Sequence, residues 1–256
     1  MSTETTALRT WVSGIALVTA FGMLWIPLGQ HGFLLAHWMK LGTFMAPFLL
    51  FVALAIQPRM PIERDLRLLS LLLLLAYIAH QFEEHWIDLY GNTYAFKPYV
   101  NGLVSDALGG DMKGAEPLTD AGVFVINTSL VWLVAALAIW RAPDHVFPML
   151  CLAAIVLVNA ISHILAGVVR GVYNPGLLTA ILVFLPLAVV IYGLTLRTGA
   201  ARIWCIAGSL VWGVLAHVVM VVGIIASGAL HLIPEWSFFL ALAIWSVLPV
   251  FLFQKP

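Results

Sequence analysis

The stretch RLLSLLLLLAYIAHQFEEHWIDL, residues 67–89, decides the fold of this chain. It begins as a long apolar run and ends in a cluster of ionisable side chains. The run is long enough to cross a hydrocarbon core of about 30 Å as a helix. An ionised carboxylate inside a membrane is costly unless it is paired, protonated or bound to a metal. The stretch therefore predicts a membrane helix that carries a functional polar site.

The rest of the sequence also has the composition of a membrane protein. Hydrophobic residues make up 62% of the chain, charged residues only 9%, and the mean hydropathy is +1.03. Soluble domains carry far more charge. The apolar runs are too long and too rich in Leu, Ala and Val for an outer-membrane barrel. We therefore predict an all-α, polytopic transmembrane helical bundle that forms a single integral membrane domain over residues 1–256.

Apolar runs of membrane-spanning length recur along the whole chain, separated by Pro, Gly, Arg and Asp. The first, second and eighth contain Pro27, Pro47 and Pro249, which kink or end helices, so a count of six or seven is compatible as well as eight. The predicted spans are residues 11–28, 34–56, 67–89, 120–140, 146–169, 176–196, 203–225 and 236–253.

Lysine and arginine are distributed unevenly between the predicted connections. With the N-terminus inside, eight of them lie on the cytoplasmic side and three on the opposite side. Since positive residues accumulate in cytoplasmic loops, we expect both termini in the cytoplasm. Cys151 and Cys205 then fall near the cytoplasmic ends of their spans, where no disulfide is expected. Seven of the eight histidines come out toward the outer side.

Helical geometry selects a core from the ionisable cluster of the third span. At about 100° per residue, His80, Glu83 and Glu84 fall within an arc of about 100°. Tyr77 extends the same face. His85 projects roughly 140° away from His80, so we expect it at the edge of the site.

Matching polar residues occur at similar depth on other predicted spans. Asn159 and His163 share one face of the fifth span, and Arg170 returns to that face near its outer end. His217 lies in the outer half of the seventh span, and Asn127 in that of the fourth. These side chains are expected to meet the third span inside the bundle.

The chemistry suited to this set is metal coordination. Imidazole and carboxylate together bind zinc, iron and manganese, and helical bundles build such sites from facing helices. We expect a divalent metal, with zinc favoured and iron as the alternative. One glutamate is expected to bind the metal while the other acts as general acid or base, and the sequence leaves open which does which. The predicted metal ligands are His80, Glu83, Glu84, His163 and His217, the catalytic residues are Glu83 and Glu84, and the substrate-binding residues are Tyr77, Asn127, Asn159 and Arg170.

The pattern His80-x-x-Glu83-Glu84 at the end of an apolar span resembles the defining motif of the HXXEE-motif family of bacterial integral membrane proteins. The resemblance extends over the third to sixth spans and includes the turn Tyr173-Asn174-Pro175-Gly176. It implies an intramembrane polar site in a bacterial inner membrane and adds no particular reaction. The inverted zincin motif His-x-x-Glu-His does not match, because five positions separate His80 from His85.

Several functions are compatible with an outer-half His/Glu site. We favour a metal-dependent enzyme with hydrolase-type chemistry on a lipid-like substrate, because the ionisable residues gather in one place, as in a pocket. A transporter using Glu83 and Glu84 as a proton or cation relay is the alternative. An acid/base isomerase without metal, a di-iron oxidase and a purely structural ion pair follow. The connection 90–119 is long enough to act as a lid. The expected partners are a membrane and a hydrophobic small molecule, and no nucleic acid.

Overall fold

The structure is a computed structural model of the chain, and it describes residues 32–55, 65–110, 116–142 and 144–253. These residues form a bundle of helices without a β-strand. Six helical segments are long and apolar enough to cross a membrane. They are Gly32–Ala55 (α3), Leu66–His85 (α4), Asp120–Arg141 (α6, η3 and α7), Phe147–Arg170 (α8), Leu177–Thr198 (α9, η4 and α10) and Ile203–Ala229 (α11 and η5).

These six segments confirm six predicted spans, with boundaries that differ by a few residues. The last predicted span, 236–253, is a shorter apolar helix, Glu235–Val247 (α12), extended by the single turn Leu248–Val250 (η6). The predicted first span, 11–28, lies outside the described residues. The predicted outer connection 90–119 contains a helix that the sequence analysis did not foresee, Phe96–Ala107 (α5).

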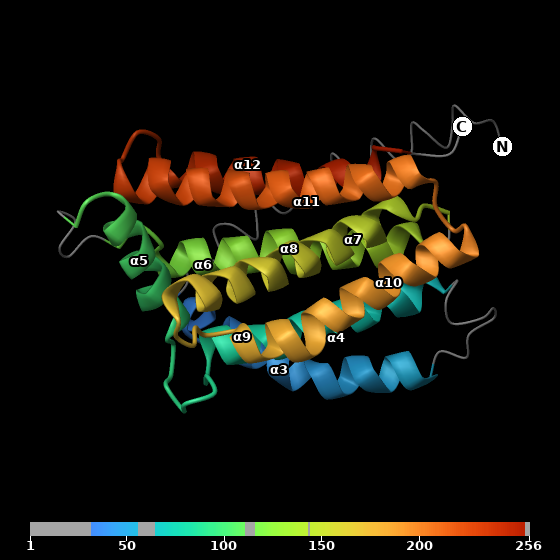
Figure 1. Cartoon of the computed structure of the whole chain (residues 1–256), viewed down its shortest axis with the longest axis horizontal. Helices are drawn as coiled ribbons and strands as arrows, with labels where there is room; N and C mark the ends of the chain where they lie inside the picture. Colours follow the sequence, from blue (N-terminus) through green and yellow to red (C-terminus); the bar gives the residue numbers. More distant parts are fainter. Residues whose placement is uncertain (1–31, 56–64, 111–115, 143, 254–256) are drawn as a thin grey trace.

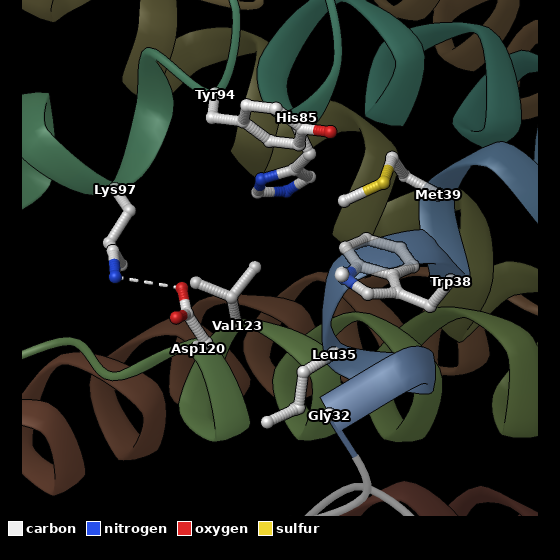
Figure 2. Close-up of a pocket in the computed structure, with 10 residues that line it drawn as sticks. Gly32, Leu35, Trp38, Met39, His85, Tyr94, Lys97, Asp120 and Val123 are labelled. Atoms are coloured by element: carbon white, nitrogen blue, oxygen red, sulfur yellow. Dashed lines mark ion pairs between the residues drawn. The ribbon is translucent and has the colours of Figure 1, made fainter.

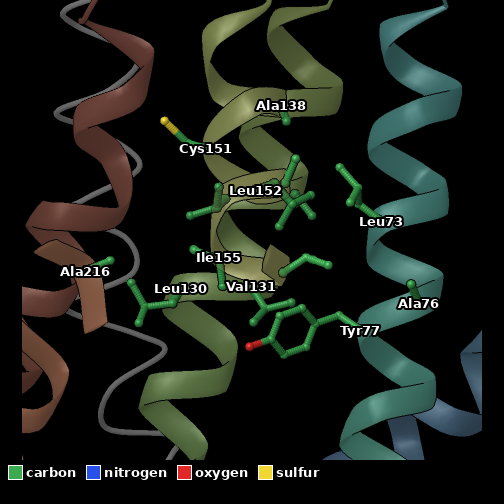
Figure 3. Packing of buried hydrophobic residues seen from close by; sticks show 14 of the residues in the cluster. Leu73, Ala76, Tyr77, Leu130, Val131, Ala138, Cys151, Leu152, Ile155 and Ala216 are labelled. Carbon is green, nitrogen blue, oxygen red and sulfur yellow. The ribbon is translucent and has the colours of Figure 1, made fainter. Parts of the chain in front are cut away.

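Helix α8 lies at the centre of the bundle, with α11 and α12 on one side and α4, α10 and α3 on the other (Figure 1). Its first half, from Phe147 to Val156, is completely enclosed. Figure 3 shows Leu73 and Tyr77 of α4 directed toward Leu152 of α8 and its neighbours in this core. The α8–α11 contact is close because Gly213 faces Ala154, and a Cβ at position 213 would lie 2.7 Å from that of Ala154.

Three of the spans contain a π-helical stretch, in which the hydrogen bonds of the α-helix are locally widened. These stretches are Thr128–Leu133 (η3), Ala180–Phe184 (η4) and Ile224–Ala229 (η5). Such stretches are rare and occur frequently at functional sites. The ring of Phe184 in η4 lies 4.2 Å from that of His80 between centroids. The distortion of this span therefore lies beside the polar cluster.

Helix α5 covers the end of the bundle at which the polar cluster lies (Figure 1). Its first residue, Phe96, packs against the rings of His85 and His163. Asp106 near its end pairs with Arg170 at 2.8 Å, and Asn101 exchanges hydrogen bonds with the backbone of Leu118. Helix α5, within the segment predicted as a lid, is thus held at this end of the bundle by apolar and polar contacts.

Candidate metal centre

Two helices bring three ionisable side chains together in the interior. His80 and Glu84 lie one turn apart on α4, and His163 projects from α8. The Oε1 atom of Glu84 lies 3.3 Å from Nε2 of His80 and 3.0 Å from Nε2 of His163. The three ligand atoms lie within 4.8 Å of one another, and all three residues are buried. The predicted meeting of the third and fifth spans therefore holds.

The tautomer of His163 is set by a residue of the following turn. Nδ1 of His163 lies 2.6 Å from Oδ1 of Asn174. The amide group of Asn174 donates to the backbone carbonyl of His163, so its Oδ1 is free to accept. Nδ1 of His163 therefore carries the hydrogen, and Nε2 of the neutral ring presents a lone pair toward Glu84.

The tautomer of His80 follows from the same reasoning. Nδ1 of His80 lies 2.7 Å from the hydroxyl oxygen of Thr179. That hydroxyl donates its one hydrogen to Oε2 of Glu83 at 2.6 Å, so it accepts from His80. Nε2 of His80 then also presents a lone pair toward Glu84.

When both imidazoles are neutral, three electron-rich atoms face one another with no hydrogen between them. Among the described residues, neither Nε2 of His80 nor Oε1 of Glu84 has a hydrogen-bond partner. A buried acceptor without a donor is costly. A single added proton would join Glu84 to one imidazole and leave the other unpaired, whereas a metal ion would bind all three. Imidazoles whose second nitrogen is held by a polar partner are the usual form of metal-binding histidine.

The loop before the span Leu177–Thr198 closes one side of this group of three side chains. Gly176 has a φ of +94°, and a Cβ placed there would lie 2.7 Å from Cε1 of His80 and 2.8 Å from both Cγ of Glu84 and Cε1 of His163. Only glycine allows the backbone to approach so closely in this conformation. An ion at this site would therefore be reached from the opposite side.

Glu83 has different contacts from Glu84. Its Oε1 accepts from the Tyr173 hydroxyl and the Leu178 N–H, and its Oε2 accepts from the N–H and hydroxyl of Thr179. These N–H groups open the span Leu177–Thr198, where a carboxylate is favoured by the helix dipole. Partial burial and the nearby Glu83 raise the pKa of Tyr173, which keeps that hydroxyl a donor. Glu83 joins two helices and supports His80 through Thr179.

His85, expected at the edge, contacts the second oxygen of Glu84. Its Nε2 lies 3.3 Å from Oε2 of Glu84 and 3.2 Å from the amide nitrogen of Asn127. Asn127 also accepts from Gln81 and donates to the carbonyl of Val123. Asn127, predicted to bind substrate, thus forms hydrogen bonds to protein groups with both ends of its amide.

A cavity of about 270 Å³ opens onto the centre between α4, α5, α6, α8 and α11. Glu84 and His163 form part of its wall, as do Tyr77 and Asn159, which are joined by a hydrogen bond of 2.9 Å. His217 lines the same cavity, with Nδ1 2.9 Å from the carbonyl of Gly213, and it is not in the group of three. Arg170, the remaining predicted substrate contact, pairs with the exposed Asp106 instead.

A second cavity, of about 550 Å³, lies on the other side of His85 (Figure 2). Its wall includes Trp38, Tyr94 and the ion pair between Lys97 and Asp120, whose charged atoms are 2.7 Å apart. Partial burial lowers the pKa of Lys97, but pairing with Asp120 and Glu116 outweighs this effect and raises the pKa above its usual value. His85 therefore lies between a cavity with a charged wall and the Glu84 centre.

The sequence analysis missed the residues that orient the ligands. Thr179 and Gly176 look ordinary in sequence, since a threonine and a glycine at the start of a span suggest only a helix boundary. Asn174 was quoted within the turn 173–176, without a role. One feature of the sequence could have indicated them: this turn precedes a predicted span, and its polar side chains are expected at about the same depth in the membrane as the motif His80-x-x-Glu83-Glu84.

Six helices of membrane-spanning length around a buried histidine–glutamate group define a multi-pass helical membrane protein with an internal polar centre. Residues 71–191 match the model of the family described as "Protein of unknown function with HXXEE motif". The matched segment contains His80-x-x-Glu83-Glu84, His163 and Asn174. No curated protein and no solved structure matches the chain.

Proposed function

We propose that this protein is a membrane-embedded metalloenzyme that binds one divalent cation through His80, Glu84 and His163. One observation carries the proposal: the lone pairs of two tautomer-fixed imidazoles and of a carboxylate oxygen converge on one buried point. A cation is the simplest occupant that stabilises all three together.

The ligand set favours zinc, with iron second. Two imidazoles and a carboxylate are the three protein ligands of one class of catalytic zinc site, which keeps a further position for water or substrate. The same set holds non-haem iron in oxygenases. A di-iron centre needs further carboxylates, and among the described residues these three form the only group that could hold an ion. The oxygens of Glu83, the neighbouring carboxylate, already accept four hydrogen bonds.

Hydrolysis of a hydrophobic substrate is the reaction that we favour. A bound divalent metal would supply a Lewis acid and a water of lowered pKa. Glu84 and His163 face the apolar cavity, so a substrate lying there would reach the centre. Asn174 and Thr179 would hold the two imidazoles in place, and Gly176 would exclude water from the opposite side. In this assignment Glu84 is the ligand and Glu83 is a positioning residue.

Transport is the weaker candidate, because a carrier needs a polar path through the membrane. On the far side of the centre, α4 and α8 contribute Leu69, Leu73, Leu150 and Leu152, which are all buried in the apolar core. The polar groups that surround Glu84 are confined to one end of the bundle. This distribution supports a pocket for a small molecule.

We further propose that the protein lies in a bacterial cytoplasmic membrane with the centre in the outer half. The asymmetry of lysine and arginine supports this orientation. A substrate would then enter from the outer leaflet or from the space outside.

Elemental analysis of the detergent-purified protein tests the proposal. We expect about one zinc or iron per chain in the wild type, and loss of most of it in His80→Ala, Glu84→Gln and His163→Ala, since removal of one ligand of three weakens binding greatly. His217→Ala is the matched control: it removes a histidine from the same cavity and should retain the metal.

The outcomes separate the alternatives clearly. A wild-type protein that is folded and free of metal, even after incubation with zinc or ferrous ion, would contradict the metalloenzyme. Loss of metal from His217→Ala would indicate that His217 is a fourth ligand of the metal. Loss of metal from Glu83→Gln together with a lowered unfolding temperature would support the positioning role of Glu83.

A further inference from the structure

We infer that the cavity beside the metal centre binds an uncharged alcohol with an apolar body. The inference rests on the proposed function in one respect, because Glu84 and His163 belong to both the cavity wall and the centre. It adds the chemical class of the molecule that would meet the metal.

The shape and lining of the cavity favour an apolar body. Its volume of about 270 Å³ is near the lower end of the range for small-molecule sites. Most of its wall is aliphatic and comes from four different parts of the bundle, for example Leu103, Ile126, Ile155 and Met220. Contact with such a wall favours binding of a hydrocarbon chain, because apolar surface is removed from water, and it offers few hydrogen-bond partners to a polar chain.

The polar part of the wall contains free donors and a free acceptor side by side. The amide nitrogen of Asn159 donates to the Tyr77 hydroxyl at 2.9 Å, which leaves the Tyr77 hydrogen and Oδ1 of Asn159. Among the described residues Oδ1 of Asn159 is buried and has no partner. If the Asn159 amide is rotated by about 180°, its oxygen accepts from the Tyr77 hydroxyl. The amide N–H groups then remain as donors and the Tyr77 oxygen remains as an acceptor. A hydroxyl group matches this pair because it both donates and accepts.

Two further groups of the wall support a hydroxyl ligand. The Tyr99 hydroxyl is buried and has no hydrogen-bond partner among the residues that the structure describes. His217 directs Nδ1 to the carbonyl of Gly213, so Nδ1 carries the hydrogen and Nε2 of the neutral ring is an acceptor. A hydrocarbon or an ether would leave these acceptors without a donor, which costs binding free energy.

Charge disfavours an ionised head group in the cavity. No lysine or arginine is found in its described lining. The cations of α5 and α8, two of the helices that line it, are paired elsewhere, Lys97 with Asp120 and Arg170 with Asp106. A carboxylate or phosphate would therefore meet acceptors at Asn159 and His217, and an ammonium would be repelled by the proposed metal.

Photolabelling of the protein in nanodiscs tests the inference. The probe is decanol with a diazirine at its methyl end, and the comparison probes are the matched methyl ether, decanoate, decyl phosphate and decylamine. Labelled peptides are mapped by mass spectrometry. We expect decanol to label peptides of α5, α8 or α11 that line the cavity, and unlabelled decanol to compete. The ether should compete roughly tenfold less well, since it cannot donate a hydrogen bond.

Two variants show whether the hydroxyl is recognised. Asn159→Leu removes the acceptor, so it should weaken competition by decanol roughly threefold to tenfold and leave competition by the ether unchanged. Tyr77→Phe removes the donor, so it should weaken competition by decanol to a similar extent. Because the same probe is used with the wild type and with each variant, its partition into the bilayer is the same in every comparison. Tyr77→Phe keeps the ring, so it remains informative if Asn159→Leu fails to fold.

The metal content of the same samples distinguishes the inference from the function on which it rests. Selective labelling by decanol in a protein without metal would support the alcohol site and contradict the metalloenzyme. Metal at full occupancy with equal competition by all five head groups, or with preference for decanoate, decyl phosphate or decylamine, would overturn the alcohol site. Glu84→Gln should lose the metal and still bind decanol.

Discussion

The side chains of the centre are held in place by residues that are not themselves ligands. Asn174 holds His163, Thr179 holds His80, and the backbone at Gly176 lies against both imidazoles and Glu84. At the scale of single residues, the motif His80-x-x-Glu83-Glu84 therefore divides into two roles. Glu84 lies with the histidines, and Glu83 accepts hydrogen bonds from the first N–H groups of the span Leu177–Thr198.

Gly176→Ala should damage the centre although position 176 contributes no ligand. The added methyl group meets all three ligand side chains, and the left-handed backbone conformation is unfavourable for alanine. We expect a loss of roughly 2–4 kcal/mol in stability from strain and overpacking together, and loss of bound metal. The thermal unfolding midpoint in detergent and elemental analysis measure these effects.

Gly171→Ala is the matched control for this substitution. Gly171 has a φ of +66°, and a Cβ there would meet open space. Its substitution should cost about 1 kcal/mol of backbone strain and leave the metal in place. Equal metal loss in both variants would show that the close approach of Gly176 is not what matters.

At the scale of elements, the start of the span Leu177–Thr198 packs against the end of α4. Its first N–H groups bind Glu83, its Thr179 supports His80, and its π-helical stretch places Phe184 on the His80 ring. The sequence indicated a helix here and could not show that its N-terminus would meet a carboxylate from another helix. Such a contact depends on how the two helices are placed in space.

The turn between α7 and α8 should make stability depend on pH. His145 in this turn is buried, and burial, together with the nearby positive Arg141, lowers its pKa below the usual 6.5. The folded protein therefore binds fewer protons here than the unfolded chain. Stability should be independent of His145 above pH 6.5 and fall as the pH decreases below it, by at most about 1.4 kcal/mol per pH unit.

Unfolding midpoints of the wild type and of His145→Gln, measured across this pH range, check the expectation. The difference between the two proteins isolates His145 from the histidines of the centre. The variant should lose less stability than the wild type on acidification. Parallel curves for the two proteins would mean that His145 does not contribute.

At the scale of the whole molecule, His80, Glu84 and His163 lie toward one end of the bundle, and α5 lies at that end (Figure 1). The uneven distribution of lysine and arginine predicts that this end faces outward. The structure supplies a suitable position for a test, because Gly102 on α5 is exposed and a Cβ there meets no other atom.

A cysteine introduced as Gly102→Cys should react with a membrane-impermeant maleimide added to intact cells. The native Cys151 is buried, and Cys205 lies near the start of α11, at the opposite end of that helix from Ala229. The wild-type protein is the control for labelling of these two cysteines. Protection of Gly102→Cys in intact cells and labelling only after lysis would reverse the proposed orientation.

The sequence by itself determined the class of this protein and the core of its site. Long apolar runs predict helices in a membrane, because a helix satisfies its backbone hydrogen bonds within one segment, and helical periodicity places His80 and Glu84 on one face. Only the tertiary structure decided that Glu84 joins His80 and His163 while Glu83 caps another helix. These contacts join residues nearly a hundred positions apart, such as Glu83 and Thr179, and no local pattern encodes how such distant segments pack.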